Sequence, residues 1–112
     1  MKDELQDLID LLHERKCSCV LRNGEIYTFE RRGVEDLYDL LREQPGLLLG
    51  ADVADKVVGK GAAALMVLGR VRRVYADVLS EPAYGLLFQT GISVSYGRLV
   101  SAIRNRAGNG WC

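Results

Sequence analysis

The sequence predicts an α/β protein: a three-layer α/β/α domain around a mixed sheet of four strands, or of five. Two observations support this fold class. Segments with apolar residues at helical spacing alternate with β-prone runs, and the last segments follow the order strand, helix, strand. At 112 residues the chain is expected to form one domain with a single core, residues 1–112, in which 105–112 is a loosely ordered tail.

The N-terminal part is predicted to form a helix and then a β-hairpin. The segment from Asp3 to about Glu14 has acids in its first turn and is typical of an amphipathic helix. Two β-prone runs follow, Cys17 to Arg22 and Glu25 to Glu30. Between them Asn23-Gly24 favours a hairpin turn, because both residues tolerate positive φ. The apolar residues at helical spacing are Leu5, Leu8, Ile9 and Leu12.

The middle of the chain is predicted to be helical. A second helix is expected from Val34 to Glu43, followed by a short apolar link from Gly46 to Gly50. A long helix is then expected from Asp52 to about Leu68. Inside that helix Gly59 and Gly61 would each cost about 1 kcal/mol relative to alanine. This cost makes the segment the most informative one in the sequence.

The C-terminal part is predicted to form a βαβ unit. Val71 to Ser80 is typical of a mostly buried strand, and Pro82 suits the first turn of a helix that runs to about Gln89. Ile92 to Tyr96 is predicted to be the next strand, parallel to the first, and Leu99 to Arg104 a short last helix. The hairpin would then supply the antiparallel part of the same sheet.

The charge balance argues against several classes of partner. Fifteen basic and fifteen acidic residues cancel, so no net field would attract nucleic acid. The apolar stretches are short and the N-terminus is acidic, so we expect a cytoplasmic protein without a membrane partner. The single tryptophan, Trp111, lies in the predicted tail and would be covered by something, which favours a homo-oligomer.

The cysteines are expected to be reduced thiols, because Cys17, Cys19 and Cys112 form an odd set. Together with His13 they would arithmetically complete a zinc site. The spacing of Cys17 and Cys19 lacks the two-residue spacer of a zinc knuckle, and on a strand both side chains would share one face of a core. No metal and no cofactor is therefore expected.

The start of the long helix is the first candidate binding site. Asp52 could cap the helix, while Lys56 and Lys60 would lie one turn apart on one side, and Asp55 and Gly59 on another. Backbone N–H groups and two lysines at a helix start favour a phosphate or carboxylate ligand. The alternative is that the charges face solvent and the small residues allow close packing on the sheet.

A second group of candidates follows the third predicted strand. Asp77 lies in a segment that should be buried, so it requires a partner, and Lys56 or an arginine could serve. Ser80 and Glu81 stand where the strand gives way to a helix, which is the edge where open α/β sheets hold their ligands. A plain strand-to-helix turn is the alternative.

The order of elements and four segments resemble one family. The segments are Gly50 to Lys60, Val74 to Val78, Ser80 to Ala83 and Asn105-Arg106, and the sequence is similar to the uncharacterised domain-of-unknown-function 1893 family over nearly the whole chain. That family resembles the cytidine-deaminase-like fold. The resemblance implies a sheet of order 2-1-3-4 and a ligand cleft over the helix start and the end of the third strand.

The zinc ligands of such deaminases are missing here. Deaminases of this fold carry a His or Cys followed two residues later by Glu, and later a Pro-Cys-x-x-Cys motif. The nearest counterparts in this sequence would be Val53-Ala54-Asp55 and the run from Pro82 to Leu86, which contain no metal ligand of that kind. Asp55 would stand where the Glu does. Zinc-dependent deamination is therefore not expected.

Three functions remain open at this point. The first is binding of a small molecule, with a nucleotide or nucleoside favoured, at the start of the 52–68 helix. The second is metal-independent catalysis, for which the candidates are Asp55, Lys56, Lys60 and the tail thiol of Cys112, beside which Arg104 and Arg106 could supply positive charge. The third is an oligomerising or partner-binding module that uses the first helix and a sheet edge.

Overall fold

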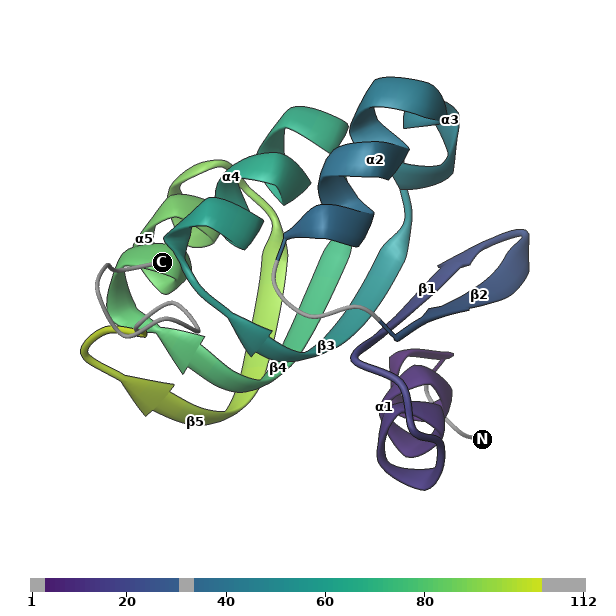
Figure 1. Cartoon of the computed structure of the whole chain (residues 1–112). Helices are drawn as coiled ribbons and strands as arrows, with labels where there is room; N and C mark the ends of the chain where they lie inside the picture. Colours follow the sequence, from purple (N-terminus) through teal and green to yellow (C-terminus); the bar gives the residue numbers. More distant parts are fainter. Residues whose placement is uncertain (1–3, 31–33, 104–112) are drawn as a thin grey trace.

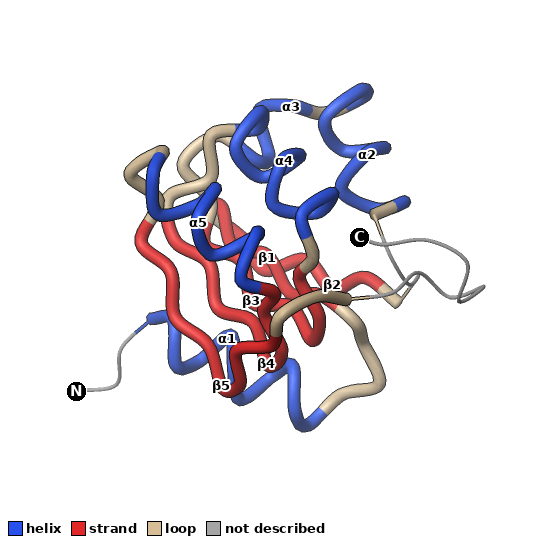
Figure 2. The backbone as a smooth tube through the Cα atoms, turned by 90° about the vertical axis from the view of Figure 1, so that its left-hand side faces the viewer, coloured by secondary structure: helices blue, strands red, loops and turns tan. Residues whose placement is uncertain are grey.

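The computed structural model describes residues 4–30 and 34–103, and within them a five-stranded mixed sheet lies between two helical layers. Helices α2 to α5 cover one face of the sheet and α1 lies on the other, as Figures 1 and 2 show. The predicted three-layer α/β/α fold is therefore confirmed, with five strands. We call the face under α2 to α5 the upper face, and the other the α1 face.

The N-terminal elements form where the sequence predicts them. They are α1 (Glu4–Glu14), β1 (Cys19–Asn23) and β2 (Glu25–Phe29). At the hairpin tip Gly24 has a φ of +76°, a left-handed conformation that glycine adopts without a steric penalty. The apolar stripe of α1 packs on the sheet through Leu8 and Leu12, which are fully buried.

The second predicted helix is also confirmed, as α2 (Glu35–Glu43). The segment expected to be a plain link contains one further short helix, α3 (Pro45–Leu48). Proline fits there because it lies at the first helical position, where its missing N–H would have no intrahelical partner. The side chain of Asn23 ties this region to the hairpin by donating to the carbonyls of Gly46, Leu47 and Leu49 at 3.0 Å each.

The long helix predicted over residues 52–68 is wrong in its first half. Asp52–Val58 forms the strand β3, and only Lys60–Gly69 forms the helix α4. β3 pairs with β1 on one side and β4 on the other, so two ladders of backbone hydrogen bonds outweigh a local helix preference. Gly59 is the N-cap of α4 with extended backbone, so it carries no helix-interior cost.

The C-terminal βαβ unit is confirmed as β4 (Arg73–Ser80), α5 (Glu81–Gln89) and β5 (Ser93–Val100). The last strand is longer than predicted, and the short helix expected over 99–104 does not form in its described part. Leu99 and Val100 instead continue the parallel pairing of β5 with β4. Cross-strand pairing again overrides a local helical pattern.

The sheet order places two strand ends and two helix starts together. The order is β2-β1-β3-β4-β5, in which β1 is antiparallel to its neighbours while β3, β4 and β5 are parallel. Its first four strands follow the 2-1-3-4 order that the family resemblance implies. The carboxyl ends of β3 and β4 therefore meet at one edge, and α4 and α5 begin there (Figure 1).

Two separate apolar clusters hold the layers together. The larger lies between the upper face and its helices, and the smaller lies under α1. Val53 and Val58 both belong to the larger cluster although five residues separate them, and so do Val74 and Leu79 on the neighbouring strand. A strictly alternating strand would send residues five apart to opposite faces. In both strands, therefore, the side chains depart once from their regular alternation between the two faces before the carboxyl edge is reached.

Gly69 offers a test of the packing between α3 and α4. A Cβ atom at this position would lie 2.7 Å from Leu48 Cδ1 and 2.8 Å from Leu48 Cβ. We expect Gly69→Ala to lower the free energy of unfolding by about 1–3 kcal/mol, the usual cost of overpacking. Urea denaturation measures this change.

Gly85→Ala is the matched control, because a Cβ at Gly85 meets nothing within 4 Å. Since this glycine lies inside helix α5, alanine should stabilise the protein there by about 0.5–1 kcal/mol. Equal effects of the two substitutions would contradict the packing that we describe.

Candidate functional site

The carboxyl edge of the parallel strands brings together most of the candidate residues. We call Asp55, Lys56, Gly59, Lys60, Ser80 and Glu81 the edge site. Here Ser80 caps α5, because its Oγ accepts a hydrogen bond from the backbone N–H of Ala83 at 3.2 Å. Helix α4 begins after Gly59, and no side chain in the described part of the chain caps it. The first N–H groups of α4 therefore carry a partial positive charge without a carboxylate or hydroxyl cap.

Asp55 lies in β3, three residues before the strand ends, and is 7% exposed. Its Oδ1 accepts a hydrogen bond from the backbone N–H of Val57 at 3.3 Å. Burial raises the pKa of Asp55 to about 7, against the lowering effect of hydrogen bonds from the Val57 and Lys56 backbone and the Cys19 thiol. The negative charge of Asp77 raises the pKa further. Asp55 is thus a carboxyl group that can hold its proton near neutral pH.

Cys19 is the cross-strand partner of Asp55 in the β1–β3 ladder. Burial and the neighbouring Asp55 charge raise the pKa of the Cys19 thiol well above its usual value, so the thiol stays protonated. The prediction that Cys17 and Cys19 share one face is wrong. Cys17 precedes the strand and packs under α1, whereas Cys19 belongs to the larger cluster.

The two candidate lysines do not share a helix. Lys56 lies on β3 and Lys60 is the first residue of α4, so the expected one-turn spacing is wrong. Both are exposed, and neither makes an ion pair within the described ranges. Glu81 is exposed as well, at the first position of α5. Lys60 is thus the lysine that stands directly at the uncapped helix start.

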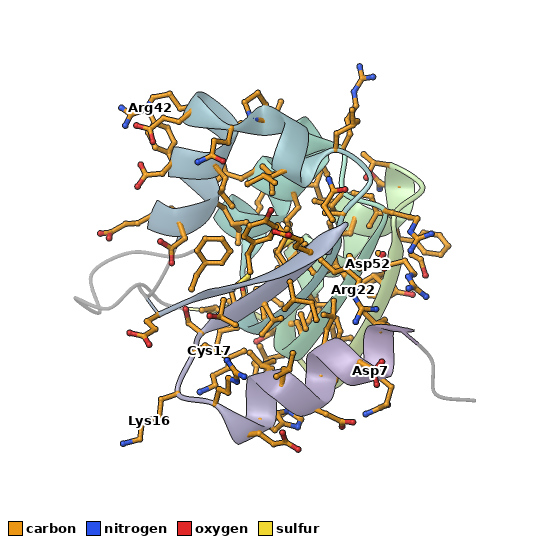
Figure 3. All side chains as sticks on the ribbon, turned by 90° about the vertical axis from the view of Figure 1, so that its right-hand side faces the viewer. Asp7, Lys16, Cys17, Arg22, Arg42 and Asp52 are labelled. Atoms are coloured by element: carbon orange, nitrogen blue, oxygen red, sulfur yellow. The ribbon has the colours of Figure 1, made fainter. Side chains whose placement is uncertain are left out.

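Asp52 does not cap a helix and lies at the opposite, amino end of β3. Its carboxylate is 2% exposed and accepts two hydrogen bonds from each of Arg72 and Arg73, at 2.7–3.1 Å. Burial alone would raise the pKa of Asp52, but the hydrogen bonds and charges of the two arginines lower it to about 2. Figure 3 places Asp52 beside Arg22 at that end of the sheet, so Asp52 belongs to a structural network away from the edge site.

Asp77 finds partners that the sequence did not indicate. Its Oδ1 accepts hydrogen bonds from His13 Nε2 at 2.7 Å and from the Tyr75 hydroxyl at 2.8 Å. Burial and the Asp77 charge raise the pKa of Tyr75 to about 12. The predicted partners, Lys56 or an arginine, are wrong for this position. Only the shared face of Tyr75 and Asp77 could have been found from their spacing, because His13 comes from α1, 64 residues away.

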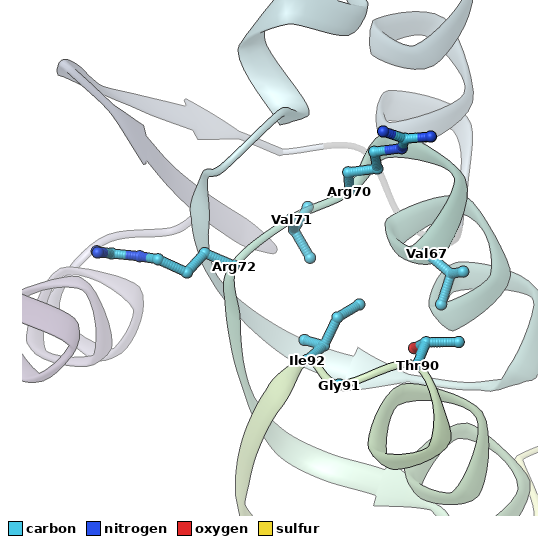
Figure 4. A pocket seen from close by; sticks show the side chains of 7 residues that line it. All are labelled: Val67, Arg70, Val71, Arg72, Thr90, Gly91 and Ile92. Carbon is cyan, nitrogen blue, oxygen red and sulfur yellow. The ribbon is translucent and has the colours of Figure 1, made fainter.

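Two surface depressions lie at the other end of the sheet. One has a volume of about 420 Å³ and is lined by residues at the ends of α4 and α5 and the starts of β4 and β5. Figure 4 shows that its two arginines, Arg70 and Arg72, extend away from the hollow. The second, of about 360 Å³, lies between α3 and the end of α4. Neither contains a candidate residue, and the diverging arginines of the first do not form an anion site.

Metal ligands do not cluster in residues 4–30 and 34–103: no three His, Cys, Asp or Glu side chains there are placed to hold an ion. Helices long and apolar enough to cross a membrane are also absent from these ranges. The predicted tail, 105–112, lies outside the described residues together with Cys112, Arg106 and Trp111 in it, and so does Arg104 just before it.

Comparison with solved structures finds α/β domains of similar architecture. RibD of Acinetobacter baumannii superposes on 83% of this chain with a TM-score of 0.53 and 16% identity, which covers 34% of RibD. A crystal structure of a DUF1893 family protein from Thermotoga maritima matches 100% of this chain and 78% of its own, with a TM-score of 0.84 and 23% identity.

The chain belongs to the family described as "Domain of unknown function (DUF1893)", whose model matches residues 7–112. A search of curated proteins finds no match. At these levels of identity the two structural likenesses show a shared fold. The family that the sequence resembles is thus confirmed, and it has no established activity.

The expected counterpart of the deaminase Glu needs correction. The structure puts Val53-Ala54-Asp55 in a strand, so Asp55 does not stand at a helix start as the deaminase Glu does. The residues at that helix start are Gly59, Lys60 and Gly61.

The pH dependence of folding tests the state of Asp55. The folded-state pKa of about 7 lies above the usual value of 3.8, so the contribution of Asp55 to stability is full below about pH 4 and is lost as pH rises through about 7. Asp55→Asn mimics the protonated group and should remove this loss. At pH 8 we expect the free energy of unfolding of the variant to exceed that of the parent by a few kcal/mol, since one unit of pKa corresponds to about 1.4 kcal/mol.

Chemical denaturation from pH 4 to pH 8 measures both proteins. Glu25→Gln serves as a control, because Glu25 is exposed at the hairpin and its removal should leave the pH profile unchanged. An Asp55→Asn variant less stable than the parent at pH 8 would contradict a buried neutral carboxyl.

Proposed function

We propose that this chain is a zinc-less, deaminase-like domain that binds a small molecule at the edge site, with a nucleotide or nucleoside favoured. One observation carries the proposal. The start of α4 is uncapped in the described part of the chain, and the exposed Lys60 stands beside its N–H groups. A phosphate at this point would receive backbone hydrogen bonds and a positive charge together.

Asp55 adds a second feature that suits a ligand. It is a carboxyl with a pKa of about 7 beneath the same edge, close to the turn that opens α4. A protonated carboxyl can donate a hydrogen bond as well as accept one, which is useful for reading the edge of a heterocyclic base. The preference for a nucleotide or nucleoside rests on the fold likeness to RibD, a deaminase.

The two helix starts at the edge differ in what they favour. α5 is capped by Ser80 and begins with the acidic Glu81, so its start is already occupied by oxygen ligands and negative charge. α4 has neither. An anion is therefore expected over α4, and the sugar or base of a nucleotide would extend toward the exposed Glu81, whose carboxylate accepts hydrogen bonds.

Ligand titration tests this function. Adenosine monophosphate, adenosine and inorganic phosphate are added separately to the full chain, and thermal shift and calorimetry follow binding. We expect the monophosphate to bind best. Lys60→Ala should weaken its binding about tenfold or more, because a hydrogen bond to a charged group contributes roughly 1.5–3 kcal/mol.

Arg42→Ala is the matched control for the loss of one positive charge. Arg42 lies in the last turn of α2, far from the edge site. The opposite end of α2 is the one near α4, because its N-cap residue, Val34, lies beside Gly61. The Arg42→Ala variant should therefore bind the monophosphate as tightly as the parent does. The absence of binding by all three compounds, or equal binding by Lys60→Ala and the parent, would sink the proposal.

A second candidate function is metal-independent acid–base catalysis by Asp55, with Lys56 or Lys60 as the ligand-positioning amine. The observation that favours it is the pKa of about 7, which suits a proton-transfer group at neutral pH. Under this function a bound nucleoside would be converted by the parent and left intact by Asp55→Asn at unchanged affinity. Chromatography of the nucleoside after incubation with each protein separates catalysis from binding alone.

A further inference from the structure

The side of the molecule formed by α5 and β5 carries an edge of the sheet. β5 is the last strand, and within residues 4–30 and 34–103 it pairs only with β4. It has eight residues, one charged side chain (Arg98) and no proline. Natural edge strands are usually short, charged, bulged or covered, since an open edge can pair with another strand. The opposite edge strand, β2, has only five residues and carries Glu25 at its start.

An aromatic cluster on α5 continues this edge into the helical layer. Tyr84 stacks on Phe88 with ring centroids 5.8 Å apart, and contacts Tyr96 of β5 edge to face at 5.9 Å. Phe88 is 65% exposed and Tyr96 is 41% exposed. α5 carries a single charged side chain, that of Glu81. The side is therefore a continuous, weakly charged surface of aromatic side chains and open backbone.

The backbone of β5 shows which groups are available for pairing. Ser93 donates its N–H to the Arg72 carbonyl at 3.3 Å, so its backbone groups face β4. Backbone directions alternate along a strand, so Val94, Tyr96, Arg98 and Val100 direct theirs toward the open edge. Four residues thus offer hydrogen-bonding groups to a second strand.

We propose that two copies of this chain associate through the α5–β5 side, with their β5 strands paired antiparallel about a two-fold axis. Eight residues span about 26 Å, and the sheet and helix layers together are about 20 Å tall. Two such strips bury on the order of 1,000 Å², the lower limit for a specific interface. An isologous pair also closes the β5 edge of both copies, whereas β5 against β2 would leave one β5 edge open to further copies. Figure 1 shows α5 and β5 on the same side of the molecule.

Analytical ultracentrifugation of the full chain from about 1 to 300 μM tests this interface. We expect a reversible dimer of twice the 12.4 kDa chain mass. Arg98→Pro removes an outward N–H without touching the ladder to β4, and Phe88→Asp places a charge in the aromatic cluster; each should raise the dimer dissociation constant at least tenfold. Leu68→Asp is the control, because Leu68 is 66% exposed but lies on α4.

Hydrogen exchange adds a readout that a folding defect would not imitate. Amides of Val94, Tyr96 and Arg98 should exchange more slowly as the concentration of the parent rises. A parent that stays monomeric to 300 μM, whether or not it pairs with an extended peptide of another protein, overturns the proposal. So does a dimer that Arg98→Pro and Phe88→Asp leave intact or that Leu68→Asp also breaks. None of these outcomes bears on ligand binding at the edge site.

Discussion

The rest of the structure depends on how the central strand β3 accommodates two carboxyl groups. β3 lies between β1 and β4, and its first four residues, Asp52 to Asp55, are buried. An uncompensated charge in such a strand would cost more free energy than most small domains can lose. The two carboxyls solve this problem differently. Asp52 is ionised between two arginines, whereas burial raises the pKa of Asp55, beside the Cys19 thiol, to about 7.

These two solutions give the ends of the sheet different properties. At the amino end, Arg72 and Arg73 are committed to Asp52, and they fix the start of β4 against the start of β3. At the carboxyl end, the uncapped start of α4 follows directly on β3, the strand that carries Asp55. A stable charged network thus anchors one end, and polar groups with unused hydrogen-bonding capacity gather at the other. This division explains why the edge site lies where it does.

The spacing of apolar residues in the sequence predicted the elements in which that spacing matches the buried face, such as α1, the hairpin and the β4–α5 pair. They failed at β3, because Ala, Asp and Lys between Val53 and Val57 suit a helix and only pairing with two neighbours makes a strand favourable. The same limit applies to the site. Asp55 was a candidate by position, but its partner Cys19 and the bond from His13 to Asp77 join segments that the fold alone brings together.

The properties of the carboxyl edge therefore depend most on the protonation of Asp55. The ¹³C chemical shift of its carboxyl carbon reports that protonation directly. Selective ¹³C labelling of aspartate and an NMR titration of the folded protein would give its midpoint, with Asp55→Asn to assign the signal. We expect the Asp55 carbon to titrate near pH 7, far above the usual aspartate value of about 3.9. A midpoint below about pH 5 would mean that the carboxyl is ionised at neutral pH, and the reading of this edge as a neutral, ligand-facing one would be contradicted.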